Sequence, residues 1–206
     1  MIRVLSLDLD GTLIPNEFVD RFWNHAIPLA YSIRHGIGYE EARRFVLGEY
    51  DRIGMRDLRW YIPWFWLRRF GLNLGYEELV RLAGIDPKPY EDAVSLLKKV
   101  RGRLIVVVST MVPLSLAFFE LKYLKGYIDE VYSAISDTGR YEKDENFYRF
   151  LSNSLGVEEK EILHVGDDYE FDYVMPRRAG LNSEHLSREG KGLRALTDLI
   201  ELYGLR

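Results

Sequence analysis

Three short apolar runs along the chain have the length and composition of buried β-strands. They cover residues 2–8, 104–108 and 161–165. Within each run the apolar residues are nearly continuous rather than alternating, which is typical of strands in a parallel sheet that is buried on both faces. Each run also ends in polar residues: Asp8 after the first, Ser109 after the second and Asp167 shortly after the third.

Helical patterns lie between these runs. Apolar residues recur at helical spacing over 89–100 and again over 144–155, and Pro113 follows the second run where a proline favours the first turn of a helix. Alternation of strands and helices predicts an α/β fold, a Rossmann-like parallel sheet with helices on both faces. In such folds ligands bind beyond the carboxyl ends of the strands, where the polar residues of this chain lie.

The stretch 16–85 has a different pattern, because it is helical throughout. Ala42, Val46 and Tyr50 fall on one face of a predicted helix together with Phe45 and Ile53. A segment rich in glycine and proline at 84–89 has the composition of a linker. We therefore predict an α/β core formed by 1–15 and 86–206, and an α-helical insert formed by 16–85.

Composition narrows the class of protein. Hydrophobic residues make up 47% of the 206 residues and charged residues 29%, which is enough for a well-formed core. A net charge of −4 argues against a general nucleic-acid binder and against a polybasic membrane-surface protein. The chain has neither a membrane-spanning apolar stretch nor a signal-peptide pattern, so we expect a cytoplasmic protein.

Two residue types are absent. The lack of cysteine excludes disulfides, thiol nucleophiles and zinc-thiolate sites. Glutamine is absent as well, while Arg, Lys and Glu are abundant, and this composition predicts a thermophilic source.

Acidic residues gather at the ends of the predicted strands. Asp8 and Asp10 end the first strand, and Asp167, Asp168 and Asp172 follow the third. The first pair taken alone also fits a solvated corner between strand and loop. Carboxylates from two separate strands, however, form an oxygen-only cluster of the kind that Mg²⁺ prefers.

Hydroxyl and amino groups complete a set suited to phosphoryl transfer. Ser109 and Thr110 end the second strand, and Lys143 begins a helical segment before the third. Lys122 and Lys125 are alternative sources of positive charge. A nucleophilic carboxylate, a second carboxylate for acid–base work, a metal, a hydroxyl and a lysine are the groups that this chemistry requires.

These segments resemble the four motifs of the haloacid-dehalogenase superfamily. The motifs are Asp8-Leu9-Asp10-Gly11-Thr12, Val106-Val107-Val108-Ser109, Lys143, and Gly166-Asp167-Asp168 with Asp172. The resemblance covers 1–15 and 86–206, and it implies that 16–85 is a small α-helical cap. Two positions depart from the common pattern: Thr110 stands where many members have Asn, and Asp144 where many have Pro.

The resemblance implies a role for each residue. Asp8 would attack phosphorus and Asp10 would act as acid and base, while Thr12 orients their loop. Mg²⁺ would bind the Asp8 carboxylate, the Asp10 backbone carbonyl and Asp167. The phosphoryl oxygens would contact the residues with hydroxyl or amino groups, which are Ser109, Thr110 and Lys143. Asp172 would support the metal shell or Lys143, and Asp168 is either a helix-start acid or a ligand.

Specificity would depend on the insert. The aromatic run 60–67 is either a roof over the substrate, a dimer surface or the core of the cap. Arg59, Trp64 and Arg68 are the candidate substrate contacts, and Arg69 is a further one, although a solvated cationic face also explains the arginines. The expected partner is a small-molecule phosphate ester, and the chain would be a monomer or a homodimer.

Three other functions remain open. A 2-haloacid dehalogenase uses the same nucleophile, but enzymes of that kind lack the acid at the position of Asp10. A phosphomutase would retain the entire set. The third alternative is an inactive binding protein, against which the presence of the full set of these residues argues. His164 lies inside an apolar strand, where a hydrogen-bonded core histidine is the better interpretation.

Overall fold

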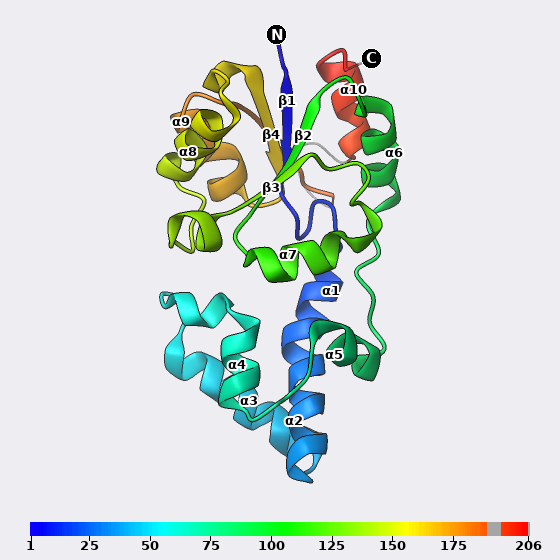
Figure 1. Cartoon of the computed structure of the whole chain (residues 1–206), viewed down its shortest axis with the longest axis vertical. Coiled ribbons are helices and arrows are strands. Elements are labelled where there is room, and N and C mark those ends of the chain that lie inside the picture. The colour runs from blue at the N-terminus through cyan, green and yellow to red at the C-terminus, as the bar shows by residue number, and fades with distance from the viewer. Residues whose placement is uncertain (189–194, 206) are drawn as a thin grey trace. The chain divides into compact units, whose positions relative to one another are not determined.

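The computed structural model describes residues 1–188 and 195–205. The chain divides into two compact units (Figure 1). One consists of Met1–Pro15 together with Lys88–Arg206, and the other of Asn16–Pro87. The second unit is inserted into the sequence of the first unit, shortly after its first strand.

A five-stranded parallel sheet forms the centre of the first unit. Its strands are β1 (Val4–Leu7), β2 (Ile105–Thr110), β3 (Glu130–Ser133), β4 (Ile162–Gly166) and β5 (Asn182–His185). They lie in the order β3-β2-β1-β4-β5, and every neighbouring pair is parallel. The three predicted strands are therefore the three central ones, and β1 lies between β2 and β4.

Helices lie on both sides of this sheet, which confirms the predicted α/β fold. Figure 1 shows α8 and α9 on one side and α6 and α10 on the other. The helices are α6 (Glu91–Val100), α7 (Leu114–Glu120), α8 (Glu145–Leu155), α9 (Met175–Arg178) and α10 (Leu199–Leu202). On the α8 side, Phe147 and Leu151 pack against Val4, Val107 and Ile162 of the sheet in one buried cluster.

Two of these helices begin where the sequence indicates. The Asp144 side chain caps α8 by accepting a hydrogen bond from Phe147 N at 3.0 Å. A carboxylate at this position accepts a hydrogen bond from an otherwise unpaired N–H, and its negative charge interacts favourably with the positive end of the helix dipole. Asp144 thus starts the helix that follows Lys143. Pro113 directly precedes α7 and has an extended backbone conformation.

The second unit is entirely helical among its described elements. These include α1 (Asn16–Arg21), α2 (Ile27–His35), α3 (Tyr39–Ile53), α4 (Pro63–Arg69) and α5 (Tyr76–Ala83). On α3 the predicted apolar face is buried at Ala42, Val46 and Tyr50, while the Phe45 side chain is 44% exposed. The core of this unit is rich in aromatic rings; Trp66 stacks on Phe70 and meets Tyr50 edge-on.

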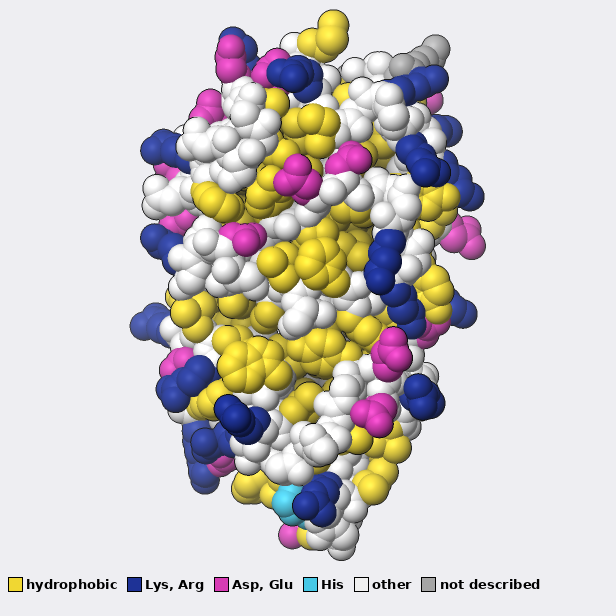
Figure 2. Space-filling model, viewed as in Figure 1, with side chains coloured by type: hydrophobic (Ala, Val, Ile, Leu, Met, Phe, Trp, Pro, Cys, Tyr) yellow, Lys and Arg dark blue, Asp and Glu magenta, His cyan; other side chains and the backbone are white. Residues whose placement is uncertain are grey.

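Within the described residues, no helix is both long and apolar enough to cross a membrane. On the face drawn in Figure 2, acidic and basic side chains are distributed among apolar and uncharged ones.

Candidate active site

The carboxyl ends of β1, β2 and β4 bring the predicted residues together. Leu7 is level with Val108 of β2 and with Val165 of β4. The next residues along these strands therefore lie at one edge of the sheet: Asp8, Ser109 and the Gly166-Asp167 pair. A hydrogen bond from Asp8 N to Val165 O, 2.9 Å long, fixes the first of them.

A tight turn after Asp8 positions Asp10 and Thr12. Gly11 has a φ of 76°, a conformation that glycine adopts without steric cost. Hydrogen bonds from Leu13 N and Ile14 N to Leu9 O, at 2.8 and 2.9 Å, close the turn. Asp10 Oδ1 and Thr12 Oγ1 are buried in this turn without a hydrogen-bond partner among the described residues. Buried polar atoms are rarely left in this way, so they indicate a place that receives polar groups of a ligand or water.

Lys143 is almost completely buried and contacts Asp8 directly. Its ammonium group donates a hydrogen bond to the Asp8 carboxylate and another to Ser109 O at 3.2 Å. It also forms an ion pair with Asp172 at 2.5 Å. Burial alone would lower the pKa of Lys143, but the Asp172 and Asp8 carboxylates raise it above its ordinary value. Lys143 is thus a fixed cation beside the predicted nucleophile.

Asp172 approaches the sheet at a glycine. A Cβ atom at Gly166 would overlap the carboxyl group of Asp172, so only glycine leaves room for this side chain. Asp172 accepts hydrogen bonds from Asp168 N at 3.1 Å and lies 3.0 Å from His164 Nε2. Burial opposes its ionisation, but Lys143 and then His164 hold the pKa of Asp172 well below its usual range.

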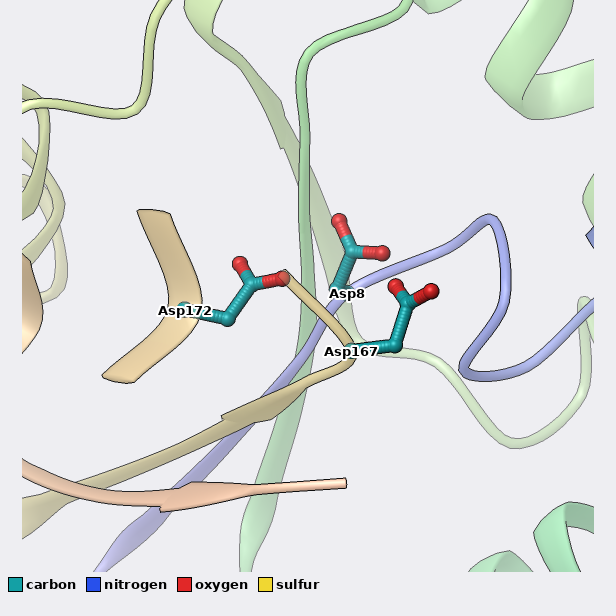
Figure 3. Close-up of side chains that lie close together, drawn as sticks. All are labelled: Asp8, Asp167 and Asp172. Atoms are coloured by element: carbon teal, nitrogen blue, oxygen red, sulfur yellow. The ribbon is translucent and has the colours of Figure 1, made fainter. Parts of the chain in front are cut away.

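Three carboxylates could hold a metal ion. Ligand atoms from Asp8, Asp167 and Asp172 all lie within 4.8 Å of one another. Figure 3 shows the three side chains projecting from β1, the end of β4 and the following helical turn toward a common space. Such all-oxygen donors fit Mg²⁺. Both oxygens of Asp172 also contact other groups of the chain.

Burial and nearby carboxylates raise the pKa values of Asp8 and Asp10. Burial raises the pKa of Asp8 well above its ordinary value against the opposing effect of Lys143, and the carboxylates of Asp172 and Asp167 add to the rise. Burial likewise raises the pKa of Asp10 to about 6. A cation beside Asp8 would favour its ionised form, which is the form that acts as a nucleophile.

The remaining predicted residues have other neighbours. Asp168 Oδ1 accepts hydrogen bonds from Glu170 N and Phe171 N at 2.9 and 2.8 Å, which corresponds to the helix-start alternative. Thr110 Oγ1 accepts one from Val112 N at 3.2 Å and so stabilises the loop after β2. Of the alternative lysines, Lys122 lies over the rings of Phe119 and Tyr123, and Lys125 is exposed.

Three buried polar residues of the site were not predicted to act there. Ser6 and His164 form hydrogen bonds beneath Ser109 and Asp172, and the buried Glu120 of α7 interacts electrostatically with Asp10. Burial and then Asp10 raise the pKa of Glu120 well above its ordinary value. The only sequence signals for these residues are polar side chains inside apolar runs. His164 is buried and hydrogen-bonded, as predicted for a core histidine.

The predicted cap residues belong to the helical unit. Arg59 contacts both carboxylate oxygens of Asp57 and lies over the Phe65 ring. Arg68 is exposed, and Arg69 forms an ion pair with the buried Glu49. The aromatic run divides between two environments, because Trp66 is completely buried whereas Trp64 is 54% exposed. Trp66 therefore belongs to the core of the unit and Trp64 to its surface.

Comparison with known proteins gives consistent matches. The family model of haloacid dehalogenase-like hydrolases matches residues 2–180. The GMP/IMP nucleotidase YrfG of Escherichia coli (strain K12) is 23% identical over 171 residues, which are 81% of this chain and 74% of that protein.

Solved structures include two informative neighbours. A HAD phosphatase from Thermococcus onnurineus is 26% identical with a TM-score of 0.80, and the match covers 99% of this chain and 98% of that one. The L-2-haloacid dehalogenase from Xanthobacter autotrophicus is 19% identical with a TM-score of 0.58, covering 93% and 80%. The second likeness concerns the fold alone. Because the family model spans most of the chain, the protein belongs to the haloacid dehalogenase-like hydrolase family and is an enzyme of that family.

Proposed function

We propose that this enzyme is a magnesium-dependent phosphatase that hydrolyses a small phosphate monoester through an aspartyl-phosphate on Asp8. The observation that carries the proposal is the position of the Asp8 carboxylate between Lys143 and Asp167 at one edge of the sheet. Lys143 supplies a fixed positive charge on one side of this carboxylate, and on the other side Asp167 could hold a metal cation with it, so that the charge of a phosphoryl group would be neutralised from both sides.

The first step forms the covalent intermediate. An oxygen of the Asp8 carboxylate attacks phosphorus, and the bond from phosphorus to the ester oxygen breaks. Asp10 gives its proton to that leaving oxygen. Its pKa of about 6 makes Asp10 a better proton donor near neutral pH than an ordinary carboxyl group, which is almost fully ionised there. Lys143 and the Ser109 hydroxyl hold the phosphoryl oxygens during this transfer.

The second step returns the enzyme to its starting state. A water molecule attacks the phosphorus of the aspartyl-phosphate, and the Asp10 carboxylate takes a proton from that water. The bond between phosphorus and the Asp8 oxygen breaks, so inorganic phosphate leaves and Asp8 is again a carboxylate. Asp8 and Asp167, with the backbone carbonyl of Asp10, would hold Mg²⁺. When bound, this ion would supply positive charge that stabilises the transferred phosphoryl group.

We assign the helical unit 16–87 the role of a cap that contacts the part of the substrate beyond the phosphoryl group. The exposed Trp64 and Arg68 are its candidate contacts. Nucleoside monophosphates are a reasonable substrate class to test first, because a curated relative is named as a GMP/IMP nucleotidase.

The proposal is tested by measuring phosphate release from a panel of phosphate monoesters that includes GMP and IMP, with Mg²⁺ and with chelator. We expect release that depends on Mg²⁺. Halide release from a 2-haloacid in place of phosphate release would establish the dehalogenase alternative, against which the presence of Asp10 argues. Isomerised sugar phosphate with little free phosphate would establish a mutase.

A further inference from the structure

A continuous chain of hydrogen bonds runs beneath the candidate phosphate site. Ser109 Oγ lies 2.8 Å from Ser6 Oγ, which in turn lies 2.8 Å from His164 Nδ1. On the other side of the ring, His164 Nε2 lies 3.0 Å from Asp172 Oδ1, and that oxygen is paired with Lys143 at 2.5 Å. The chain thus begins at Ser109 and ends at Lys143, the two residues that we propose to contact the phosphoryl oxygens.

The register of the strands explains how this chain of hydrogen bonds forms. Ser6 and His164 are directly paired neighbours in the parallel strands β1 and β4. Their side chains and that of Ser109 are completely buried, so water does not satisfy them. Polar groups in such surroundings cost free energy unless each finds a partner, and apolar side chains would fill strand positions without that cost. In this chain of hydrogen bonds, each buried polar side chain has a partner.

The direction of each hydrogen bond follows from its neighbours. Both groups near His164 Nε2 are acceptors: the Asp172 carboxylate, and the Tyr148 hydroxyl, which donates its own proton to Phe171 O at 2.6 Å. Nε2 therefore carries the proton. Burial lowers the pKa of His164, so the ring is neutral and Nδ1 accepts from the Ser6 hydroxyl. Ser6 Oγ is then free to accept from the Ser109 hydroxyl.

We propose that Ser6 and His164 are positioning residues of the active site: they hold Ser109 and, through Asp172, Lys143 in the geometry that receives a phosphoryl group. This inference rests on the proposed function, because it takes Ser109 and Lys143 as phosphate contacts. His164 fixes the carboxylate of Asp172, whose oxygen pairs with the ammonium group of Lys143. Ser6 donates its hydroxyl proton to His164 Nδ1 and so keeps the ring proton on Nε2, where it faces Asp172.

The hydrogen-bond direction is tested without any reaction. In the full-length protein with ¹⁵N-labelled histidine, NMR distinguishes a protonated ring nitrogen from an accepting one. We expect the resonance that disappears in His164→Gln to show a protonated Nε2 and an accepting Nδ1. Ser6→Ala should shift that Nδ1 resonance and leave His25, which pairs with Tyr39 in the helical unit, unchanged. A protonated Nδ1 in the unsubstituted protein would overturn the assigned direction.

The positioning role is tested by the affinity for inorganic phosphate in the presence of Mg²⁺, measured by calorimetry and as product inhibition. His164→Leu removes the hydrogen bonds to Ser6 and to Asp172, and we expect phosphate to bind roughly tenfold more weakly, because a hydrogen bond to a charged group is lost. His164→Gln can donate its amide N–H to Asp172, so we expect it to recover most of the affinity. Thermal unfolding of each variant shows whether it is folded.

The outcomes separate this inference from the proposed function. Equal loss of phosphate affinity in folded His164→Leu and His164→Gln would overturn the positioning role, as would unchanged affinity in His164→Leu. If His164→Leu does not fold, Ser6→Ala decides, because we expect a severalfold loss of phosphate affinity there and a loss of less than twofold would overturn the role. A wild-type protein that releases no phosphate from any ester would instead remove the proposed function, whereas the NMR result would still establish the chain of hydrogen bonds.

Discussion

Asp8 and Asp10 are two residues apart, yet their surroundings suit them to different tasks. Asp8 meets the ammonium group of Lys143, which favours the ionised form of its carboxyl group, and a ligand atom of Asp167 lies within 4.8 Å of it. Asp10 lies in the turn after β1, and its carboxyl group contacts Glu120 rather than a basic residue. Separate environments for two carboxyl groups are a general way of assigning nucleophile and acid.

The pH dependence of the first step should report Asp10. Its pKa of about 6 lies above the ordinary value of 3.8, so the proton that it donates is present below pH 6 and is lost as the pH rises. We expect kcat/KM for an alkyl phosphate to fall about tenfold per pH unit well above pH 6. An aryl phosphate, whose leaving group needs no proton, should show a weaker decline. The same steep decline in the residual activity of Asp10→Asn would contradict this assignment.

Gly166 has a structural task that no other residue can fill. In Gly166→Ala the new methyl group would overlap the Asp172 carboxyl, so Asp172 must move away from Lys143. We expect a loss of about 1–3 kcal/mol in the free energy of unfolding, measured by denaturant titration, together with weaker phosphate binding. Gly126→Ala is the matched control in the same unit, because no atom lies within 4 Å of its added methyl group. Equal stability of the two variants would argue against the close packing.

Single residues also show the limit of sequence reasoning. Asp8, Ser109 and Asp167 were identified because motifs at the ends of strands mark them, and Lys143 because it begins the helical segment before the third predicted strand. Ser6 could not be identified in this way, because a lone serine in an apolar strand does not reveal its neighbours on adjacent strands. Glu120 lies in a helix more than 100 residues from Asp10, and only the packing of α7 brings the two carboxyl groups together.

The strands of the sheet differ in how visible they are in the sequence. The central strands β1, β2 and β4 are covered on both faces, so their sequences are almost continuously apolar and were predicted. The edge strands β3 and β5 were missed. They contain polar residues such as Glu130, Asn182 and Glu184, because an edge strand is only partly covered. The helices α6 and α8 were predicted within two residues of their observed starts.

The loop after β4 contains two adjacent acids with different expected roles. Asp167 faces Asp8, whereas Asp168 caps the following helical turn through its Oδ1 atom. We expect Asp167→Asn to abolish Mg²⁺-dependent turnover and to weaken Mg²⁺ binding in calorimetry, while Asp168→Asn retains both because an asparagine also caps a helix. Full activity in excess EDTA, or loss of metal binding in Asp168→Asn alone, would contradict the proposed ligands.

At the scale of the whole molecule, we propose that the sheet unit carries out the chemistry and that the helical unit determines selectivity. The aromatic run separates these contributions, because Trp66 is buried and Trp64 is exposed within the same helix. We expect Trp66→Ala to cost about 3–5 kcal/mol of stability. Trp64→Ala should leave the melting temperature nearly unchanged but lower kcat/KM for the preferred substrate more than for a small generic ester. Thermal unfolding and kinetics with both substrates check this division.

A contrary result would be equally clear. Proportional losses for both substrates in Trp64→Ala, with a lowered melting temperature, would place Trp64 among the residues that only stabilise the helical unit. Arg68→Ala offers a second variant at an exposed position of the same helix.

The central claim is that Asp8 becomes phosphorylated during turnover. Borohydride reduces an aspartyl-phosphate to homoserine, so the enzyme is quenched with borohydride during turnover, digested and examined by mass spectrometry. We predict homoserine at position 8 only when both Mg²⁺ and substrate are present, and no such product in Asp8→Asn, whose phosphate release should fall to no more than roughly a thousandth. Unmodified Asp8 in the turning-over enzyme, together with undiminished phosphate release by Asp8→Asn, would contradict the account.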